Sequence, residues 1–207
     1  MLGSLRSPYN ARIADYGRAV SVTGVVPRLD LVASQPGMLS EGAELIQDLF
    51  QLPVRPLVPF ALATISPAST IFHPARIFEL LDQPDASDQR FYRDWGEFAA
   101  GAYLQMDDDL AQLRRALGWN IDGLDARSHY GVKSAPKLAA RIRSLAGLPD
   151  IGTPFRAGGL DPVHRFVRED LTHGLAVALG IAREAGASAP AMQETFDRIS
   201  ASLAAPK

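Results

Sequence analysis

The sequence predicts a mainly α-helical protein, in which a C-terminal helical bundle follows a partial α/β segment. Residues 1–70 hold short β-type runs that Pro and Gly interrupt, whereas residues 71–207 hold longer stretches of helical period. The composition is that of a globular chain, since 47% of its 207 residues are hydrophobic and 21% are charged. We therefore expect two regions, with a partial α/β fold over residues 1–68 and an all-α fold over residues 69–207.

Two short runs in the first region have the character of β-strands. Residues 19–23 are rich in β-branched side chains and end at Gly24. Residues 29–32 follow Pro27, and their side chains alternate between apolar and polar at Leu29, Asp30 and Leu31. Because only a few residues separate the two runs, we expect them to form neighbouring strands.

A helix and an extended segment complete the first region. Apolar side chains follow Ser40 at spacings of three and four residues as far as Phe50, which predicts a helix between them. Residues 54–59 contain Pro56 and Pro59, which exclude a helix interior, so this segment is predicted to be extended. The order strand, strand, helix, strand is α/β in character but too short for a complete doubly wound sheet.

Five helices are predicted in the second region. The first begins at Pro74, because proline suits the first helical turn, and ends near Pro84. The second is a long helix from Ser87-Asp88 to Trp119, with apolar residues at steps of three, four or seven and Gly118 near its end. The remaining predicted helices cover residues 136–146, residues 163–182 and a segment from 188 or 190 to 203.

Charge and residue usage exclude several classes of protein. The 21 Lys and Arg residues against 23 Asp and Glu residues give a net charge of −2, which argues against an electrostatic nucleic-acid binder. The absence of cysteine excludes disulfides, iron–sulfur clusters, thiolate zinc sites and cysteine nucleophiles. No apolar run approaches the roughly 20 residues of a membrane span, and the first residues lack a signal-peptide core. We expect a soluble, cytoplasmic protein that binds neither nucleic acid nor membrane.

An acidic run and a glycine pair are weak candidates for ligand sites. The run Asp107-Asp108-Asp109 falls inside the long predicted helix, where three consecutive side chains point in different directions and cannot converge on one ion. We therefore predict a solvated acidic turn and no metal site. Gly158-Gly159 follows no strand, and the sequence contains no G-x-G-x-x-G fingerprint, no Walker loop and no H-E-x-x-H pattern.

His73 is the first candidate catalytic residue. It follows the apolar pair Ile71-Phe72 and precedes Pro74, which places it at a helix N-terminus. There the helix dipole disfavours the imidazolium, so the neutral ring is available as a base. The alternative is a capping or buried histidine with no catalytic role.

The segment from His164 to Asp170 is the second candidate. On a helix, Arg165 and Glu169 lie on one face, and Asp170 lies near the apolar side. One interpretation is a solvated helix with surface ion pairs. The other requires the fold to bring Asp170 to His73, where the carboxylate would orient the imidazole and stabilise its charged form.

A set of short segments occurs along the chain in a defined order. The segments are residues 8–13, 16–20, 48–50, 54–56, 71–74 (Ile-Phe-His-Pro), 91–92, 130–131, 151–154, 165–170 (Arg-Phe-Val-Arg-Glu-Asp), 174–175 and 186–190. This ordered set spans nearly the whole chain and resembles the octopine/nopaline (opine) dehydrogenase family. The early segments resemble the last part of that family's nucleotide-binding Rossmann domain, and the later ones resemble its helical domain.

The resemblance implies an activity and a site. Opine dehydrogenases join the amine of an amino acid to a 2-oxo acid and reduce the imine with NADH or NADPH, with the substrates between a Rossmann domain and a helical domain. By this resemblance, residues 1–68 are a Rossmann remnant, and residues 69–207 are the substrate-binding and catalytic domain. His73 matches the catalytic histidine, and Asp170 matches its carboxylate partner.

The resemblance also implies two substrate-binding residues. Arg165 matches an arginine that would hold a substrate carboxylate, for which a guanidinium fork is well suited. Ser69 stands in the stretch before the histidine where the family usually has an asparagine that contacts the substrate or the ring. No residue of the chain is assigned to NAD or NADP by the resemblance, because the family's glycine-rich phosphate loop has no counterpart in the sequence.

Three functions follow as alternatives. The first is the catalytic part of an NAD- or NADP-dependent opine dehydrogenase that acts on an amino acid and a 2-oxo acid. A missing N-terminal Rossmann partner or a second copy of the chain, in a homodimer, would complete this enzyme. The second is a non-catalytic interaction or dimerisation module. The third is a domain that binds amino or oxo acids through Arg165 and His73.

Overall fold

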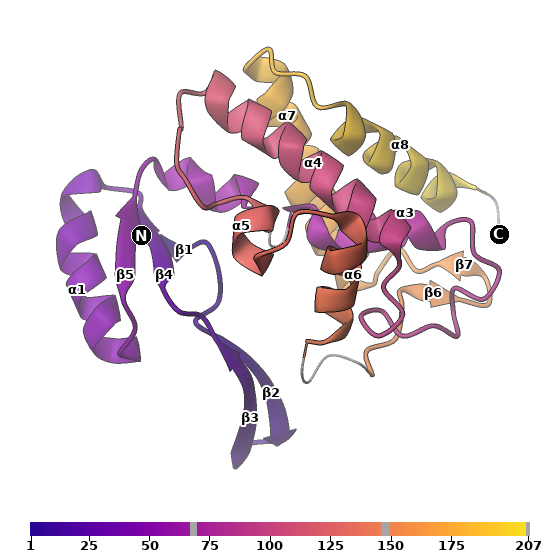
Figure 1. The fold of residues 1–207 in the computed structure, drawn as a ribbon, viewed down its shortest axis with the longest axis horizontal. Coiled ribbons are helices and arrows are strands. Elements are labelled where there is room, and N and C mark those ends of the chain that lie inside the picture. Colours follow the sequence, from indigo (N-terminus) through magenta and orange to yellow (C-terminus); the bar gives the residue numbers. More distant parts are fainter. Residues whose placement is uncertain (67–69, 146–149, 206–207) are drawn as a thin grey trace. The chain divides into compact units, whose positions relative to one another are not determined.

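The computed structural model describes residues 1–66, 70–145 and 150–205 of the 207-residue chain. The chain divides into two compact units, residues 1–66 and residues 67–207. The first unit contains strands and helix α1, and the second is mostly helical (Figure 1). The predicted fold class, a helical bundle after a partial α/β segment, is therefore confirmed. The expected boundary at residues 68 and 69 lies outside the described residues.

A three-stranded sheet forms the centre of the first unit. Strand β4 (Leu29–Ala33) lies between the antiparallel strand β1 (Leu2–Ser4) and the parallel strand β5 (Val54–Leu57). Helix α1 (Leu39–Phe50) connects the two parallel strands and packs on them, as a crossover between parallel strands requires. The 3-10 helix η1 (Pro36–Met38) lies between β4 and α1, and a second one, η2 (Phe60–Ile65), follows β5.

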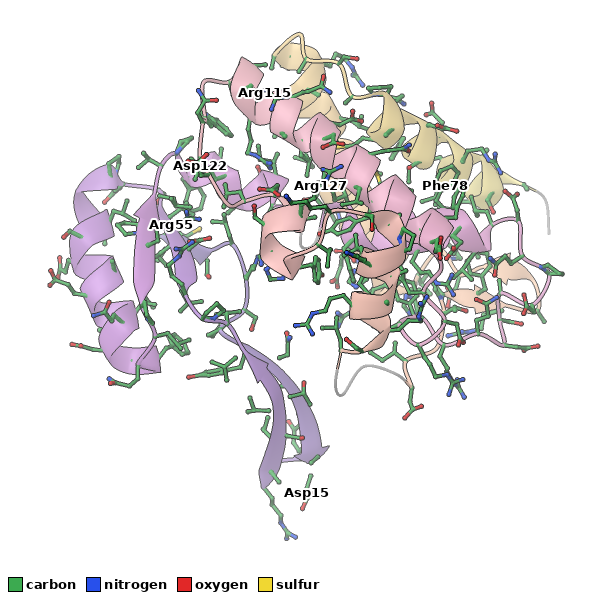
Figure 2. The ribbon with its side chains drawn as sticks, viewed as in Figure 1. Asp15, Arg55, Phe78, Arg115, Asp122 and Arg127 are labelled. Carbon is green, nitrogen blue, oxygen red and sulfur yellow. The ribbon has the colours of Figure 1, made fainter. Side chains whose placement is uncertain are left out.

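Strand β3 (Ala19–Val25) pairs with β2 (Tyr9–Asp15) in an antiparallel hairpin and makes no ladder with β4. The prediction that residues 19–23 and 29–32 are neighbouring strands is therefore wrong. A turn at Gly17, whose φ of +75° suits glycine, returns the chain directly onto β2. Asp15 lies at the tip of this hairpin (Figure 2). The short turn closes at a small entropic cost, which favours the local partner.

Three helices form the centre of the second unit. Helices α3 (Phe72–Leu80), α4 (Glu97–Ala116) and α8 (Pro190–Ala204) pack against one another (Figure 1). Their shared core is apolar, and its fully buried side chains include Ile77, Leu80, Leu110, Leu113 and Ile199. Burial of each such side chain contributes about 1.5–3 kcal/mol, so this core accounts for much of the stability of the unit.

The other elements of the second unit surround this core. Helices α5 (Ala126–Tyr130) and α6 (Ala135–Arg143) pack on α4, and α7 (Ala176–Glu184) contacts α8. A short hairpin of β6 (Phe155–Arg156) and β7 (Gly159–Leu160) precedes the π-helix η3 (Phe166–Leu175). The helices predicted at residues 136–146 and 190–203 thus correspond to α6 and α8.

The start of helix α4 differs from the prediction. The helix begins at Glu97 and not at Ser87-Asp88, because a tertiary contact sets its first turn. The Glu79 carboxylate of α3 accepts hydrogen bonds from the backbone N–H groups of Gly96 and Ala99, each at 3.2 Å. This carboxylate satisfies N–H groups that a local capping side chain would otherwise satisfy. Gly96 has no space for a side chain, since a Cβ there would lie 1.9 Å from Glu79 Oε1.

The predicted helix over residues 163–182 is one continuous helical stretch in the structure, but its first part is a π-helix and its second part an α-helix. Residues 166–175 form η3, and residues 176–184 form α7. The hydrogen bonds of η3 reach five residues back, as the donation from the Ala176 N–H to the Leu171 carbonyl shows. The apolar spacing predicted a helix, but it did not distinguish this wider turn from an α-helical one.

Two of the three consecutive aspartates on α4 are buried. Asp107 is 1% exposed and Asp109 is 3% exposed, whereas Asp108 is exposed, so the prediction of a solvated acidic turn is wrong. Asp107 accepts a hydrogen bond from the Ala126 N–H at 2.7 Å, and Asp109 accepts one from the Met192 N–H at 3.0 Å. The two carboxylates therefore hold the N-termini of α5 and α8 against α4.

Two features often tied to function do not occur within residues 1–66, 70–145 and 150–205. No helix there combines the length and the apolar character that crossing a bilayer requires. In the same residues, no three His, Asp or Glu side chains converge as metal ligands do.

Candidate active site

His73 is the second residue of α3, so its predicted place at a helix N-terminus is confirmed. Pro74 follows it in the first turn, where the missing N–H of proline costs no helical hydrogen bond. The His73 side chain is 12% exposed. The ring is therefore mostly enclosed by protein but still within reach of solvent.

Asp170 lies on η3, 97 residues beyond His73, and the fold brings the two side chains together. The distance from His73 Nδ1 to Asp170 Oδ2 is 2.7 Å, and the Asp170 side chain is 15% exposed. The packing of η3 on α3 produces this contact. Partial burial lowers the local dielectric, which strengthens a hydrogen bond to a carboxylate.

A tyrosine hydroxyl occupies the other ring nitrogen. Tyr92 Oη lies 2.8 Å from His73 Nε2. An ionised Asp170 can only accept, so the proton of a neutral ring resides on Nδ1, and Nε2 accepts a hydrogen bond from the Tyr92 hydroxyl. When the ring is protonated, Nε2 donates to the same hydroxyl oxygen. The three side chains therefore form one hydrogen-bonded chain from carboxylate to phenol.

Aromatic rings enclose His73. Phe166 stacks on the imidazole with ring centroids 3.9 Å apart and an interplanar angle of 13°, and Phe91 contacts it edge-on at 5.6 Å. Phe166 and Asp170 lie about one turn apart on η3, so a single helix supplies both the stacking ring and the carboxylate. This packing restricts the orientation of the imidazole.

Two basic side chains, Arg165 and His164, lie next to the aromatic ring of Phe166. The guanidinium carbon of Arg165 is 5.3 Å from the centre of the Phe166 ring, a cation–π contact, and the Arg165 side chain is exposed. His164 contacts the edge of Phe166 at 4.8 Å. Burial, and then the nearby charge of Arg156, lowers the pKa of His164, so its ring favours the neutral form near neutral pH.

Ser69, the second residue predicted to bind the substrate, lies outside the described residues. The buried Ser66 hydroxyl donates to the Leu5 carbonyl at 3.2 Å within the first unit, and Thr70 is 2% exposed. His173 is exposed at the surface of η3.

Sequence reasoning did not assign Tyr92 and Phe166 to the site. Tyr92 follows Phe91 in one of the segments that carry the family resemblance, yet it lies 19 residues from His73 in an irregular segment. No local spacing indicates that its hydroxyl faces the imidazole. Phe166 fitted an apolar helical stripe, which predicts burial but not the ring against which it packs.

The family of the chain follows from a match over well over half of its length. Residues 58–203 match the family described as NAD/NADP octopine/nopaline dehydrogenase, alpha-helical domain. The chain belongs to the octopine/nopaline dehydrogenase family. It is thus related to NAD- or NADP-dependent oxidoreductases, and the second unit corresponds to the helical domain. No curated protein sequence matches the chain.

Solved structures of opine dehydrogenases have a similar fold. An octopine dehydrogenase with NADH and pyruvate is 20% identical with a TM-score of 0.71, and the match covers 99% of this chain and 55% of that one. An octopine dehydrogenase with NADH and agmatine is 21% identical with a TM-score of 0.68, over 95% and 54%. A yersinopine dehydrogenase without ligand is 14% identical with a TM-score of 0.65, over 98% and 57%. The chain therefore spans about half the length of these relatives.

Proposed function

We propose that this chain provides the substrate-side, proton-transferring part of an opine-type dehydrogenase. The reaction joins the amine of an amino acid to a 2-oxo acid and reduces the resulting imine with NADH or NADPH. The observation that carries this proposal is the contact of 2.7 Å between His73 and Asp170, two residues that lie 97 positions apart. A histidine hydrogen-bonded to a carboxylate and enclosed by aromatic rings has the composition of a general acid–base site.

The condensation needs a group that accepts and returns protons. Attack of the amine nitrogen on the carbonyl carbon forms a C–N bond and leaves an extra proton on nitrogen, which the neutral His73 ring accepts. The ring returns this proton to the alkoxide oxygen that the attack creates, which gives a hydroxyl group. It then carries the second proton from the nitrogen to that hydroxyl, which leaves as water as the C–O bond breaks and the C=N bond forms. Asp170 stabilises the imidazolium between these steps, and Tyr92 extends the proton path from Nε2.

Arg165 is the proposed anchor for a substrate carboxylate. Both substrates carry a carboxylate, and a guanidinium binds one through two parallel hydrogen bonds. Arg165 is exposed, contacts Phe166 and makes no ion pair with the other residues that the structure describes. Ser69 remains a proposed second contact to the substrate.

The dinucleotide needs more protein than the described residues offer. When bound, it supplies the hydride that reduces the imine. The turn after β4 contains Pro36 and the single glycine Gly37. The prediction that Gly158-Gly159 follows no strand is wrong, because the pair follows β6, but it forms the turn of the β6–β7 hairpin and leads into a strand, not into a helix N-terminus that could bind a phosphate. These residues do not fit the pyrophosphate, so the chain's own contribution is the proton chemistry.

Exposed apolar side chains in the first unit favour a protein partner. On α1, Leu45 is 63% exposed and Leu49 is 68% exposed, and on the β2–β3 hairpin Ile13 is 65% exposed and Val20 is 60% exposed. Apolar side chains that gather at a surface often mark an interface. We propose that the partner is a nucleotide-binding Rossmann unit or a second copy of this chain. A role as an interaction module alone is the second candidate that these side chains favour.

A turnover assay with the purified chain tests the proposal. The oxidation of NADH or NADPH is followed with amino acids and 2-oxo acids, and H73A is expected to lower the rate by about 10²–10⁴-fold. The matched control is H173A, because His173 is exposed and close in sequence to Asp170. Turnover that H73A leaves unchanged would refute the assignment. An absence of turnover, together with unchanged nicotinamide fluorescence, would show that the chain alone does not bind the dinucleotide, and the assay is then repeated with a nucleotide-binding Rossmann unit added. No turnover in that mixture, although the dinucleotide binds, would refute catalysis by this chain and favour the interaction module.

A further inference from the structure

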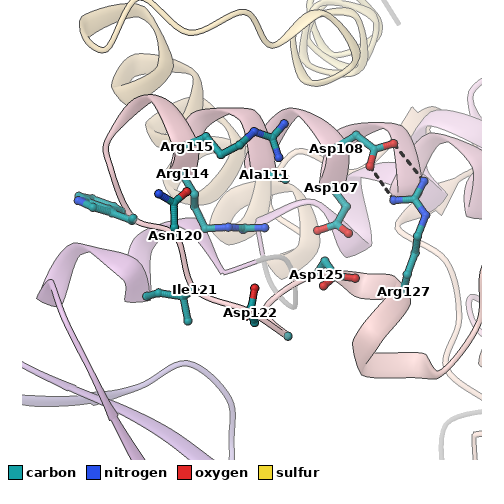
Figure 3. Close-up of a pocket in the computed structure, with 12 residues that line it drawn as sticks. Asp107, Asp108, Ala111, Arg114, Arg115, Asn120, Ile121, Asp122, Asp125 and Arg127 are labelled. Carbon is teal, nitrogen blue, oxygen red and sulfur yellow. Dashed lines mark hydrogen bonds and ion pairs between the residues drawn. The ribbon is translucent and has the colours of Figure 1, made fainter.

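A cavity of about 420 Å³ lies between α4 and the segment that leads into α5. Figure 3 shows the guanidinium of Arg114 and the carboxylate of Asp107 on the same side of α4, both directed toward that segment. Neither residue belongs to the His73–Asp170 pair. The charged residues that line the cavity are Asp107, Asp108, Arg114, Arg115, Asp122, Asp125 and Arg127.

Two charged groups in this cavity have unpartnered polar atoms. Arg114 is 5% exposed, and its buried Nη1 has no hydrogen-bond partner among the described residues. Asp107 is 1% exposed, and its buried Oδ1 also has no such partner there, although its Oδ2 accepts from the Ala126 N–H at 2.7 Å. The charges of Arg114 and Asp107 offset each other in part, but the Arg114 Nη1 and Asp107 Oδ1 atoms still lack hydrogen bonds, so both groups favour a ligand that supplies them.

Three neighbouring charged groups of the cavity already have hydrogen-bond partners. Asp108 forms two hydrogen bonds with Arg127, at 2.6 Å and 3.0 Å. Asp125 caps α5 by accepting from the Ser128 N–H at 2.8 Å and from its hydroxyl at 2.7 Å. Arg115 and Asp122 are exposed to solvent. The buried groups that need a partner are therefore one cation, Arg114, and one anion, Asp107.

The charge of the cavity decides which kind of ligand fits. Three arginines and four aspartates line it, which gives 3 − 4 = −1 when all are ionised. A simple anion would pair with Arg114 but would be repelled by the Asp107 carboxylate and would leave its Oδ1 without a donor. A simple cation would pair with Asp107 and leave Arg114 without an acceptor. A ligand with both charges satisfies both groups, and a volume of about 420 Å³ suits a small one.

We infer that this cavity binds a small zwitterion of the α-amino acid type, with its carboxylate on Arg114 and its ammonium group on Asp107. The guanidinium fork matches a carboxylate, and the Asp107 oxygen accepts from an ammonium group. This site does not depend on the proposed catalytic function, because its binding residues lie on α4 and not on α3 or η3.

Calorimetric titration of the full chain tests the inference with three probes of similar size. L-Alanine carries both charges, propionate lacks the ammonium group, and ethylamine lacks the carboxylate. L-Alanine is expected to bind at least about tenfold more tightly than either other probe, because each of them leaves one buried charge unpaired. Equal binding of propionate and L-alanine would overturn the zwitterion assignment. The absence of binding by L-alanine at millimolar concentration would overturn the site itself.

Variants locate the bound L-alanine. D107N keeps an acceptor for the Ala126 N–H, so the fold is retained while the charge is lost, and we expect affinity to fall at least about tenfold. R114M is expected to abolish binding, and R141Q, at an exposed arginine of α6, is the control with no expected effect. H73A separates this site from the proposed catalytic one. If H73A abolishes the binding of L-alanine and D107N leaves it unchanged, the inference is overturned. This outcome does not depend on the result of the turnover assay.

Discussion

Replacing Asp107 with asparagine is expected to stabilise the protein at alkaline pH and to leave its stability in acid almost unchanged. Asp107 is 1% exposed, and burial raises the pKa of its carboxyl from 3.8 to about 6. The hydrogen bond from the Ala126 N–H and the charge of Arg114 act in the opposite direction without offsetting burial. The ionised carboxylate is therefore disfavoured in the folded protein relative to the unfolded chain.

The sign and size of the effect follow from this pKa. Because the folded protein holds the proton more tightly, the contribution of Asp107 to stability is fully present below a pH of 3.8 and is lost as the pH rises through about 6. The difference between the two pKa values corresponds to about 3 kcal/mol in the free energy of unfolding. D107N carries no charge, so above this range it should be more stable than the wild type by up to about 3 kcal/mol.

Urea unfolding followed by tryptophan fluorescence measures this difference. Both tryptophans, Trp95 and Trp119, lie in the second unit, so the signal reports the unit that contains Asp107. Free energies of unfolding are compared for the wild type and D107N at about pH 4, pH 6 and pH 8. D108N is the control, since the exposed pair of Asp108 with Arg127 contributes at most about 1 kcal/mol. A D107N variant that is less stable at about pH 8, or a difference that does not vary with pH, would refute the reasoning.

Three further predictions concern packing and local stability. G96A is expected to destabilise the protein by more than about 2 kcal/mol, because the new Cβ would displace the Glu79 carboxylate from the start of α4. A melting temperature equal to that of the wild type would contradict this account. L110A should cost about 2–5 kcal/mol in urea unfolding, since Leu110 is fully buried, and a loss below 1 kcal/mol would show that the core is not packed there. The backbone amides of residues 1–60 should exchange their hydrogens faster than those of α3, α4 and α8, because the sheet of the first unit has only three strands. Equal protection of the two sets of amides would contradict this prediction.

The sequence predicts elements well where local chemistry determines them. Pro74 stands in the first turn of α3, two residues after the helix begins, and Pro190 is the first residue of α8, because the first helical turn needs no proline N–H. Gly118, with a φ of +73°, follows α4 in the conformation that glycine favours after a helix. His73 was identified by the same local reasoning about a helix N-terminus.

Local patterns fail where a distant group decides the structure. The start of α4 depends on Glu79, which lies 17 residues before Gly96, and no nearby residue indicates this contact. Asp107 and Asp109 are buried because they hold the N-termini of two other helices, whereas consecutive acidic residues usually predict a solvated surface. Strand pairing failed for the same reason, since the run at residues 19–23 indicates a strand but not its partner.

In the candidate site, some residues could be predicted from the sequence and others depend on contacts between distant segments. His73 and Asp170 were named from the family resemblance, and their contact could be confirmed only in three dimensions. The hydroxyl of Tyr92 and the stacked ring of Phe166 depend on how α3, η3 and an irregular segment pack together. These are the contacts that fix the orientation of the imidazole.

Nitrogen-15 NMR of the histidine rings tests most directly whether Asp170 and Tyr92 hold His73 ready for proton transfer. In the wild type, the neutral His73 ring should carry its proton on Nδ1, with Nε2 as the acceptor. D170A should shift the ring toward the Nε2–H tautomer, and Y92F should change the Nε2 signal alone. Y16F is the control, because Tyr16 lies in the first unit and is 88% exposed. A wild-type ring already in the Nε2–H tautomer, or one that D170A leaves unchanged, would contradict the account.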